Sequence, residues 1–229
     1  MPGTEPGDGL QDRVRIVLRP VGSGLPLGFF AFGVGMALLG GLDLEIVPVG
    51  QSPQLGWMLI TFVAPAELVA AVIAFASRDG AAGTGLGLFA AAWSGIGGQL
   101  VLGPPGGSSA VLGVYLLVFS TAVALLALAA RRGQPLMAAV LTLSAVRGYF
   151  DGVHEFTGTG WAQTTAGVLA WVITVAALYG GLAFVLEDGA HRTVLPLGRR
   201  GDSATALGGG GLDGQLSDLD AEAGVRRRL

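Results

Sequence analysis

The sequence predicts an all-α membrane protein with six transmembrane helices, and three observations support this prediction. Only 13% of the 229 residues are charged, about half the share found in soluble domains. The mean hydropathy is +0.65. Between Gly80 and Ala130 there is no Asp, Glu, Lys, Arg or His, over a length that crosses a hydrocarbon core of about 30 Å twice as helix. These features exclude a soluble enzyme and a disordered chain, and the net charge of −3 argues against nucleic acid as a partner.

Six apolar segments have about the length of a spanning helix, which needs roughly 20 residues. Barrel strands would alternate with period two over about ten residues, whereas these runs are longer and uniformly apolar, so we expect helices. Many of their residues are small, which lets helix backbones approach closely in a bilayer. The segments are Leu25–Leu42, Pro53–Ala76, Thr84–Leu102, Ser109–Ala130, Pro135–Phe156 and Trp161–Leu186.

Each segment ends at Gly, Pro or charged residues that a helix in lipid does not continue through. In chain order the breaks are Asp43 with Glu45, Arg78-Asp79-Gly80, Gly103-Pro104-Pro105-Gly106-Gly107, Arg131-Arg132-Gly133 and Gly158–Gly160.

The arginines predict the orientation in the membrane. They precede the first segment, occupy the loops after the second and fourth, and follow the sixth, whereas the other three loops contain none. By the positive-inside rule both termini are cytoplasmic and the number of helices is even. We therefore expect a multi-pass protein of the inner cell membrane, in contact with membrane lipid. It has a cytoplasmic N-terminal segment (1–22), a six-helix domain (23–198) and a disordered cytoplasmic tail (199–229).

Ionisable side chains inside spanning segments are candidates for function, because each costs roughly 2.5–3.5 kcal/mol to insert. The second segment contains Glu67. The fifth carries a polar stripe on one helix face, and we place Val140, Leu141 and Val146 on the opposite face. The stripe consists of Ser144, Arg147, Asp151, His154 and Glu155.

Two interpretations of these groups stay open. Arg147 and Asp151 are four residues apart, so they can form a structural pair along the helix. Alternatively, Arg147 is a charged binding site for a small carboxylate. His154 is either solvated at the outer end or senses external pH, and Glu155 lies in an outer vestibule. Glu67 is either a protonated, neutral hydrogen-bonding group or a proton carrier.

Neither a cofactor nor a metal site is predicted. The chain has no cysteine, and Asp151, His154 and Glu155 would make a weak set of metal ligands. The Gly33-x-Gly35 pair lies inside an apolar span without a preceding strand, so it is not a dinucleotide site. Ser144 and His154 are ten residues, roughly 15 Å, apart along one helix, which argues against an intramembrane enzyme.

Several motifs give the chain a family resemblance between Leu25 and Gly198. The start of the first segment, with Pro26, Leu27 and Gly28, resembles the Asn-Pro-Ala-Pro-Leu-Gly signature of the acetate uptake transporter family, the SatP/YaaH group. Arg192-Thr193-Val194-Leu195-Pro196-Leu197-Gly198 resembles that family's Arg-Thr-Val-Leu-Pro-x-Gly ending. Gly83–Leu88 and Leu112–Leu116 are similar to its Gly-Asn-Thr-Phe-Gly-Leu and Leu-Gly-x-Tyr-Leu motifs.

The resemblance implies six helices per protomer, a ring-like homohexamer with a path in each protomer, and passage of acetate, succinate or similar monocarboxylates. It implies a constriction at Phe32, at Ser94 with Trp93 beside it, and at Ser144 with Leu143 beside it. The family has Tyr and Leu where this chain has Ser94 and Ser144, and Gln where it has Glu67.

From this we expect a carboxylate to enter near His154 and Glu155, pass Phe32 and Trp93, and be steadied by the polar groups Ser94, Ser144 and Arg147. Proton coupling, where present, falls to Glu67 or Asp151. The sequence leaves open a channel or a proton symporter. It also leaves open another solute in the same scaffold (ammonia, a cation or a neutral molecule), because the acidic side chains repel anions, and a signalling protein that acts through the tail.

Overall fold

The computed structural model describes residues 22–77, 79–131, 133–190 and 192–199, and these fold into helices joined by short loops, without a strand among them. Six helical crossings in this part of the chain are long and apolar enough to span a membrane, which confirms the predicted fold class. The elements are α2 (Leu25–Asp43), η1 (Val49–Gln51), α3 (Ser52–Met58), η2 (Leu59–Val63), α4 (Ala64–Ala76), α5 (Gly80–Leu102), α6 (Ala110–Ala130), α7 (Pro135–Thr157) and α8 (Gly160–Ala190).

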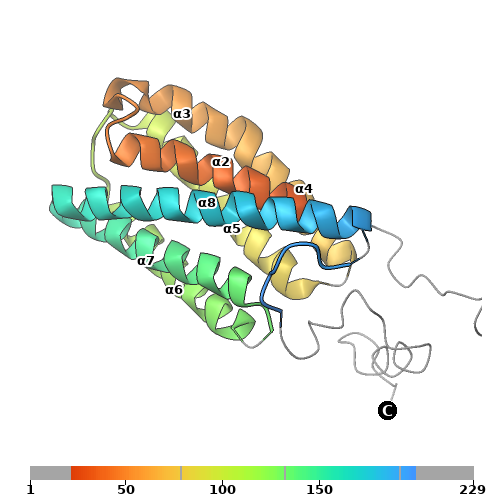
Figure 1. Cartoon of the computed structure of the whole chain (residues 1–229). Helices are drawn as coiled ribbons and strands as arrows, with labels where there is room; N and C mark the ends of the chain where they lie inside the picture. Colours follow the sequence, from red (N-terminus) through yellow and green to blue (C-terminus); the bar gives the residue numbers. More distant parts are fainter. Residues whose placement is uncertain (1–21, 78, 132, 191, 200–229) are drawn as a thin grey trace, which may run out of the picture.

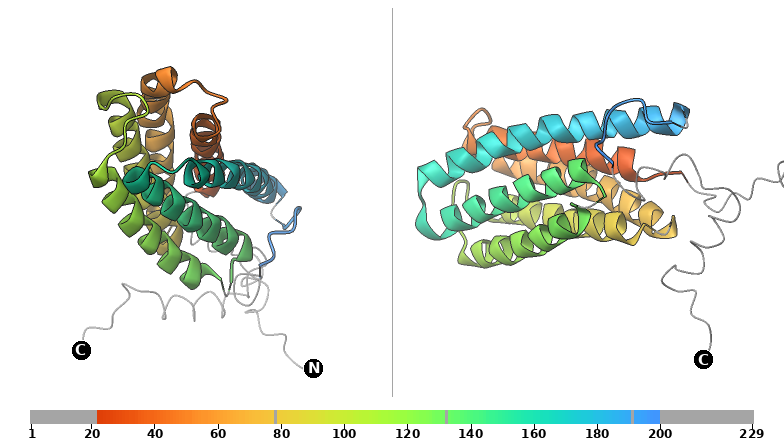
Figure 2. Two further views of the ribbon diagram at one scale, coloured as in Figure 1. Left: turned by 90° about the vertical axis from the view of Figure 1, so that its left-hand side faces the viewer. Right: turned by 60° about the horizontal axis from the view of Figure 1, so that its bottom comes forward.

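The helices run side by side in one bundle (Figures 1 and 2). The connections from α2 to α3, from α5 to α6 and from α7 to α8 lie at one end, on the left in Figure 1. The most extensive packing joins α2 with α8, α6 with α7, and α4 with α5, whereas α5 and α6 touch far less. By the predicted orientation the left end faces outward.

The second crossing is not a regular α-helix. It starts with the 3₁₀ turn η1, four residues before the predicted start, and contains the π turn η2 between α3 and α4. Pro65 lies two residues after this turn; its ring crowds the carbonyl four residues earlier and it has no N–H to donate. A π turn accommodates such a position by widening the helix locally.

The other boundaries lie within a few residues of the predicted ones. α5 begins at Gly80 because the Asp79 side chain accepts a hydrogen bond from the Ala82 N–H at 3.0 Å and caps the helix. α7 ends at Thr157 and is capped by Gly158, whose φ of 64° is left-handed and favours glycine. α8 continues to Ala190, beyond the predicted Leu186.

The segment after α8 folds back on the bundle. Leu197 is buried, the Tyr179 hydroxyl donates to the Pro196 carbonyl at 2.9 Å, and Arg199 forms an ion pair of 2.6 Å with the buried Glu187. The family-like ending therefore packs against α8, and so does Arg199, which we assigned to the tail. The rest of that tail, and residues 1–21 of the N-terminal segment, lie outside the described residues.

Small residues bring α3 and α5 together. A Cβ on Gly56 would lie 2.6 Å from the Gly97 carbonyl oxygen, and a Cβ on Gly97 would lie 2.8 Å from the Gly56 carbonyl oxygen. Both distances are shorter than van der Waals contact, and the obstacle is backbone. The crossing of these two helices therefore requires glycine on both sides.

Replacing Gly97 by alanine should destabilise the bundle by about 1–3 kcal/mol, because the two backbones must move apart. Gly98→Ala is the matched control, since a Cβ there meets nothing within 4 Å. Thermal unfolding in detergent, followed by tryptophan fluorescence, should show a lower midpoint for Gly97→Ala alone. Equal midpoints for the two variants would contradict the proposed close contact.

Candidate functional site

The inner part of the bundle contains a cavity of about 290 Å³. Its lining comes from α2, α4, α5, α6, α7 and the loop before α7, and it reaches from the ends of α5 and α6 toward the middle of the bundle. By the predicted orientation this end is cytoplasmic. The lining residues are Gly28, Phe29, Phe32, Glu67, Ala81, Ala82, Gly85, Leu86, Phe89, Leu126, Ala129, Ala130, Gly133, Gln134, Met137, Val140 and Leu141.

A cluster of aromatic side chains closes the end of the cavity that lies near the middle of the bundle. Phe32 packs edge-to-face against Phe89 and Trp93, with ring centroids 4.7 and 5.8 Å apart. Phe89 packs in the same way against Phe119 at 5.3 Å. Gly35 on α2 makes room for the indole, because a Cβ there would lie 2.9 Å from the Trp93 ring. We call Phe32, Phe89 and Trp93 the aromatic seal.

Glu67 is the one charged residue among the described residues that line the cavity. Its side chain has no exposed surface, and its Oε1 accepts a hydrogen bond of 2.8 Å from Trp93 Nε1. Its Oε2 is buried and has no partner in the described part of the chain. Trp93 thus supplies, from α5, the partner that the second segment itself does not offer.

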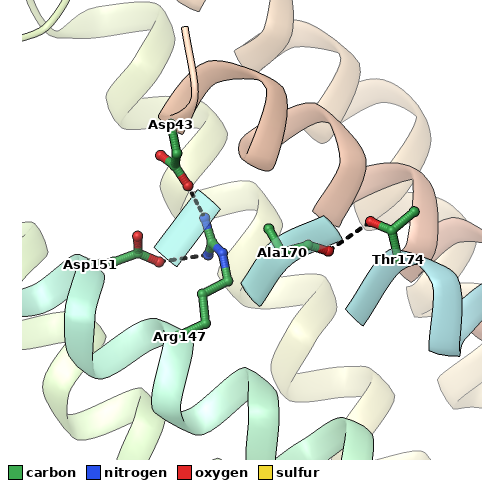
Figure 3. A network of polar contacts seen from close by, with 5 residues as sticks. All are labelled: Asp43, Arg147, Asp151, Ala170 and Thr174. Atoms are coloured by element: carbon green, nitrogen blue, oxygen red, sulfur yellow. Dashed lines mark hydrogen bonds and ion pairs between the residues drawn. The ribbon is translucent and has the colours of Figure 1, made fainter. Parts of the chain in front are cut away.

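Two residues of the polar stripe of α7 form a three-residue ion network with Asp43 of α2, drawn in Figure 3. One terminal nitrogen of Arg147 lies 2.6 Å from Asp151, and the other lies 2.7 Å from Asp43 at the end of α2. The Arg147 side chain is 6% exposed, so both ion pairs are largely removed from solvent. The pairing of Arg147 with Asp151 predicted by their spacing is present, and Asp43 is a partner that the spacing does not reveal.

The ion network lies beyond the cavity along α7. The cavity lining ends on α7 at Val140 and Leu141 and includes neither Ser144 nor Arg147. The interpretation that Val140 and Leu141 lie opposite the polar stripe is wrong: both are buried, and of that set Val146 alone is exposed. Positions three and four residues before Ser144 lie only about 60° and 40° from it around a helix, so they share its face.

The structure separates the side chains predicted for the constriction. Phe32 and Trp93 are in contact and buried, whereas Ser94 is exposed and donates to the Ala90 carbonyl of its own helix. Ser144 is buried and donates to the Val140 carbonyl at 2.7 Å, and Leu143 is partly buried against the core. On α5 it is therefore Trp93 that faces the interior.

His154 and Glu155 contact the loops at the left-hand end of the bundle in Figure 1. His154 Nδ1 lies 3.1 Å from the Thr159 carbonyl oxygen, and Glu155 accepts a hydrogen bond of 2.5 Å from the Ser109 N–H. Within the described ranges, no three Asp, Glu or His side chains are close enough to hold a metal ion.

Comparison with known proteins identifies the fold. No family model matches the sequence, and neither does any curated protein. Among solved structures, the bacterial acetate channel SatP superposes with a TM-score of 0.69 over 77% of this chain and 99% of the SatP chain, at 20% sequence identity. The chain therefore has the fold of this channel, and the resemblance inferred from the motifs is confirmed at the level of the fold.

Replacing Arg147 by glutamine should destabilise the protein by about 3–5 kcal/mol, because it leaves two largely buried carboxylates without their cation. Arg131→Gln is the matched control, since Arg131 is exposed at the end of α6. Denaturant-induced unfolding in detergent should give a lower free energy of unfolding for Arg147→Gln than for Arg131→Gln. If Arg147→Gln is as stable as Arg131→Gln, the ion network is not a structural element.

Proposed function

We propose that this chain is a membrane channel or carrier for small monocarboxylates such as acetate, with one path inside each protomer. The cavity supports this proposal most directly, because it penetrates a bundle that has the fold of an acetate channel and ends at the aromatic seal. Its volume of about 290 Å³ is far more than the roughly 30 Å³ that one water molecule takes in the liquid, and it accommodates a short-chain acid.

The proposed route continues from the cavity through the seal and along α7. The seal blocks it in this conformation, because Phe32, Phe89 and Trp93 are each at most 6% exposed and Phe32 packs against both other rings. Passage therefore requires these rings to change rotamer. Beyond the seal the next polar groups on α7 are Ser144 and Arg147.

Arg147 has a donor, the Nε–H, that a carboxylate can use without breaking the ion network. Both terminal nitrogens face aspartates, but the buried Nε has no partner within the described chain. A carboxylate oxygen bound there would receive a charge-assisted hydrogen bond. Proton coupling through Asp151 or Glu67 belongs to the same proposal, since either carboxyl can hold a proton on this route.

The assembly we propose is a homohexamer in the cell membrane with cytoplasmic termini. The distribution of arginines supports the orientation, and the family resemblance supports the oligomer. The outer surfaces of the helices carry many exposed apolar side chains, among them Phe62, Val72 and Val118, which suit lipid or a neighbouring protomer.

Replacing Phe32 by alanine should widen the seal and raise uptake of a bulky monocarboxylate, such as benzoate, several-fold relative to acetate. Uptake of the labelled acids into proteoliposomes measures this ratio. Phe62→Ala is the matched control, because Phe62 is 54% exposed on the outside of the second crossing. An unchanged ratio in Phe32→Ala would show that the seal does not lie on the path. Absence of acetate uptake by the unaltered protein would refute the proposed function.

A further inference from the structure

The cavity presents its ligand with a single carboxyl group in apolar surroundings. Glu67 Oε1 is held by the Trp93 indole, and Oε2 is buried without a partner among the described residues. The neighbouring lining, including Phe32, Phe89 and Leu141, is apolar, and none of the described lining residues is basic. Gln134, near the other end of the cavity, adds one neutral amide.

These surroundings favour an uncharged Glu67. An ionised carboxylate removed from water is costly unless a cation accompanies it, and the cavity supplies none from its described lining. A neutral carboxyl group instead offers one O–H donor and one carbonyl acceptor side by side. A carboxylate anion would bring an uncompensated charge into the same space, and that arrangement is unfavourable for the same reason.

Trp93 fixes which edge of the carboxyl group is available. The indole N–H can only donate, so it selects Oε1 as its acceptor and leaves the O–H on Oε2. Oε1 keeps a second lone pair for another donor. The free edge of Glu67 is thus a donor next to an acceptor, and its complement is a planar group with a carbonyl and an adjacent O–H or N–H.

We propose that Glu67 binds the neutral carboxyl or carboxamide group of a small apolar-bodied solute through two complementary hydrogen bonds. The solute then occupies the cavity as the undissociated acid, or as an amide of the same shape, and not as the anion. The Oε2 hydroxyl of Glu67 donates to the carbonyl of the solute, and the O–H or N–H of the solute donates to Oε1. This inference rests on the proposed function and specifies the species that the cavity holds.

Acetamide tests the inference, because it has the shape of acetic acid and does not ionise. Labelled acetamide and acetate uptake would be measured in proteoliposomes holding the full chain, together with the membrane current under an acetate gradient. We expect acetamide to enter the proteoliposomes and to compete with acetate for uptake. We also expect acetate to enter without producing a membrane current.

Variants of Glu67 separate hydrogen bonding from packing. Glu67→Gln keeps a donor and an acceptor, so uptake of both solutes should stay within about threefold of the unaltered protein. Glu67→Leu removes both groups and should lower both uptakes at least tenfold. Trp93→Phe frees the carboxyl to rotate and should weaken competition by acetamide. Val69→Leu, on the exposed side of α4, is the control and should change neither uptake.

Three results would overturn the inference. The first is acetate passing as a current while acetamide is excluded; acetate transport itself, and so the proposed function, would then stand. The second is full uptake by Glu67→Leu. The third is methylammonium uptake that Glu67→Gln abolishes, because it would show an ionised Glu67. If Glu67→Leu fails to fold, competition by acetamide in the unaltered protein decides. If neither solute enters at all, the proposed function fails as well.

Discussion

Charge that lies within a hydrocarbon environment must be neutralised, and this constraint organises the bundle. Arg147 lies between Asp43 and Asp151, so its two terminal nitrogens each face a carboxylate. Asp43 belongs to α2, whereas Arg147 and Asp151 belong to α7, and these two helices make few other contacts. The ion network therefore adds a direct link between two helices whose backbones make few contacts, and α8 packs against both of them.

The two ends of α7 satisfy the same constraint in different ways. Toward the outer end, as we orient the chain, ionisable groups are paired with each other or with loop backbone, as Glu155 is with the Ser109 N–H. Toward the other end the lining is apolar and the single acid, Glu67, has only a neutral indole as partner. On the route we propose, a solute that moves along α7 passes between a region of compensated charge and a region that favours neutral groups. The aromatic seal stands between the two.

The sequence alone predicts those features that depend on runs of apolar residues and on short spacings along one helix. Six apolar runs give six crossings, and a separation of four residues gives the pair of Arg147 with Asp151. Contacts between distant segments do not follow from such patterns: the contacts of Glu67 with Trp93 and of Arg147 with Asp43 depend on how separate helices pack against one another. Ser94 illustrates a further limit, since family resemblance aligns a position, whereas the rotation of α5 decides that its neighbour Trp93 faces inward.

The residues that hold the helices together differ from the residues that line the cavity in this protein. The fold depends on close helix contacts, such as that of Gly56 with Gly97, which tolerate little change. The chemistry of the cavity depends on a few lining side chains that the helix contacts do not constrain. At 20% identity the backbone still superposes on an acetate channel, while Glu67 stands where the resembling family has glutamine. Because a carboxyl group and an amide differ in the charge they can carry, under the proposed function this one position can alter which form of a solute is admitted without any change in how the helices pack.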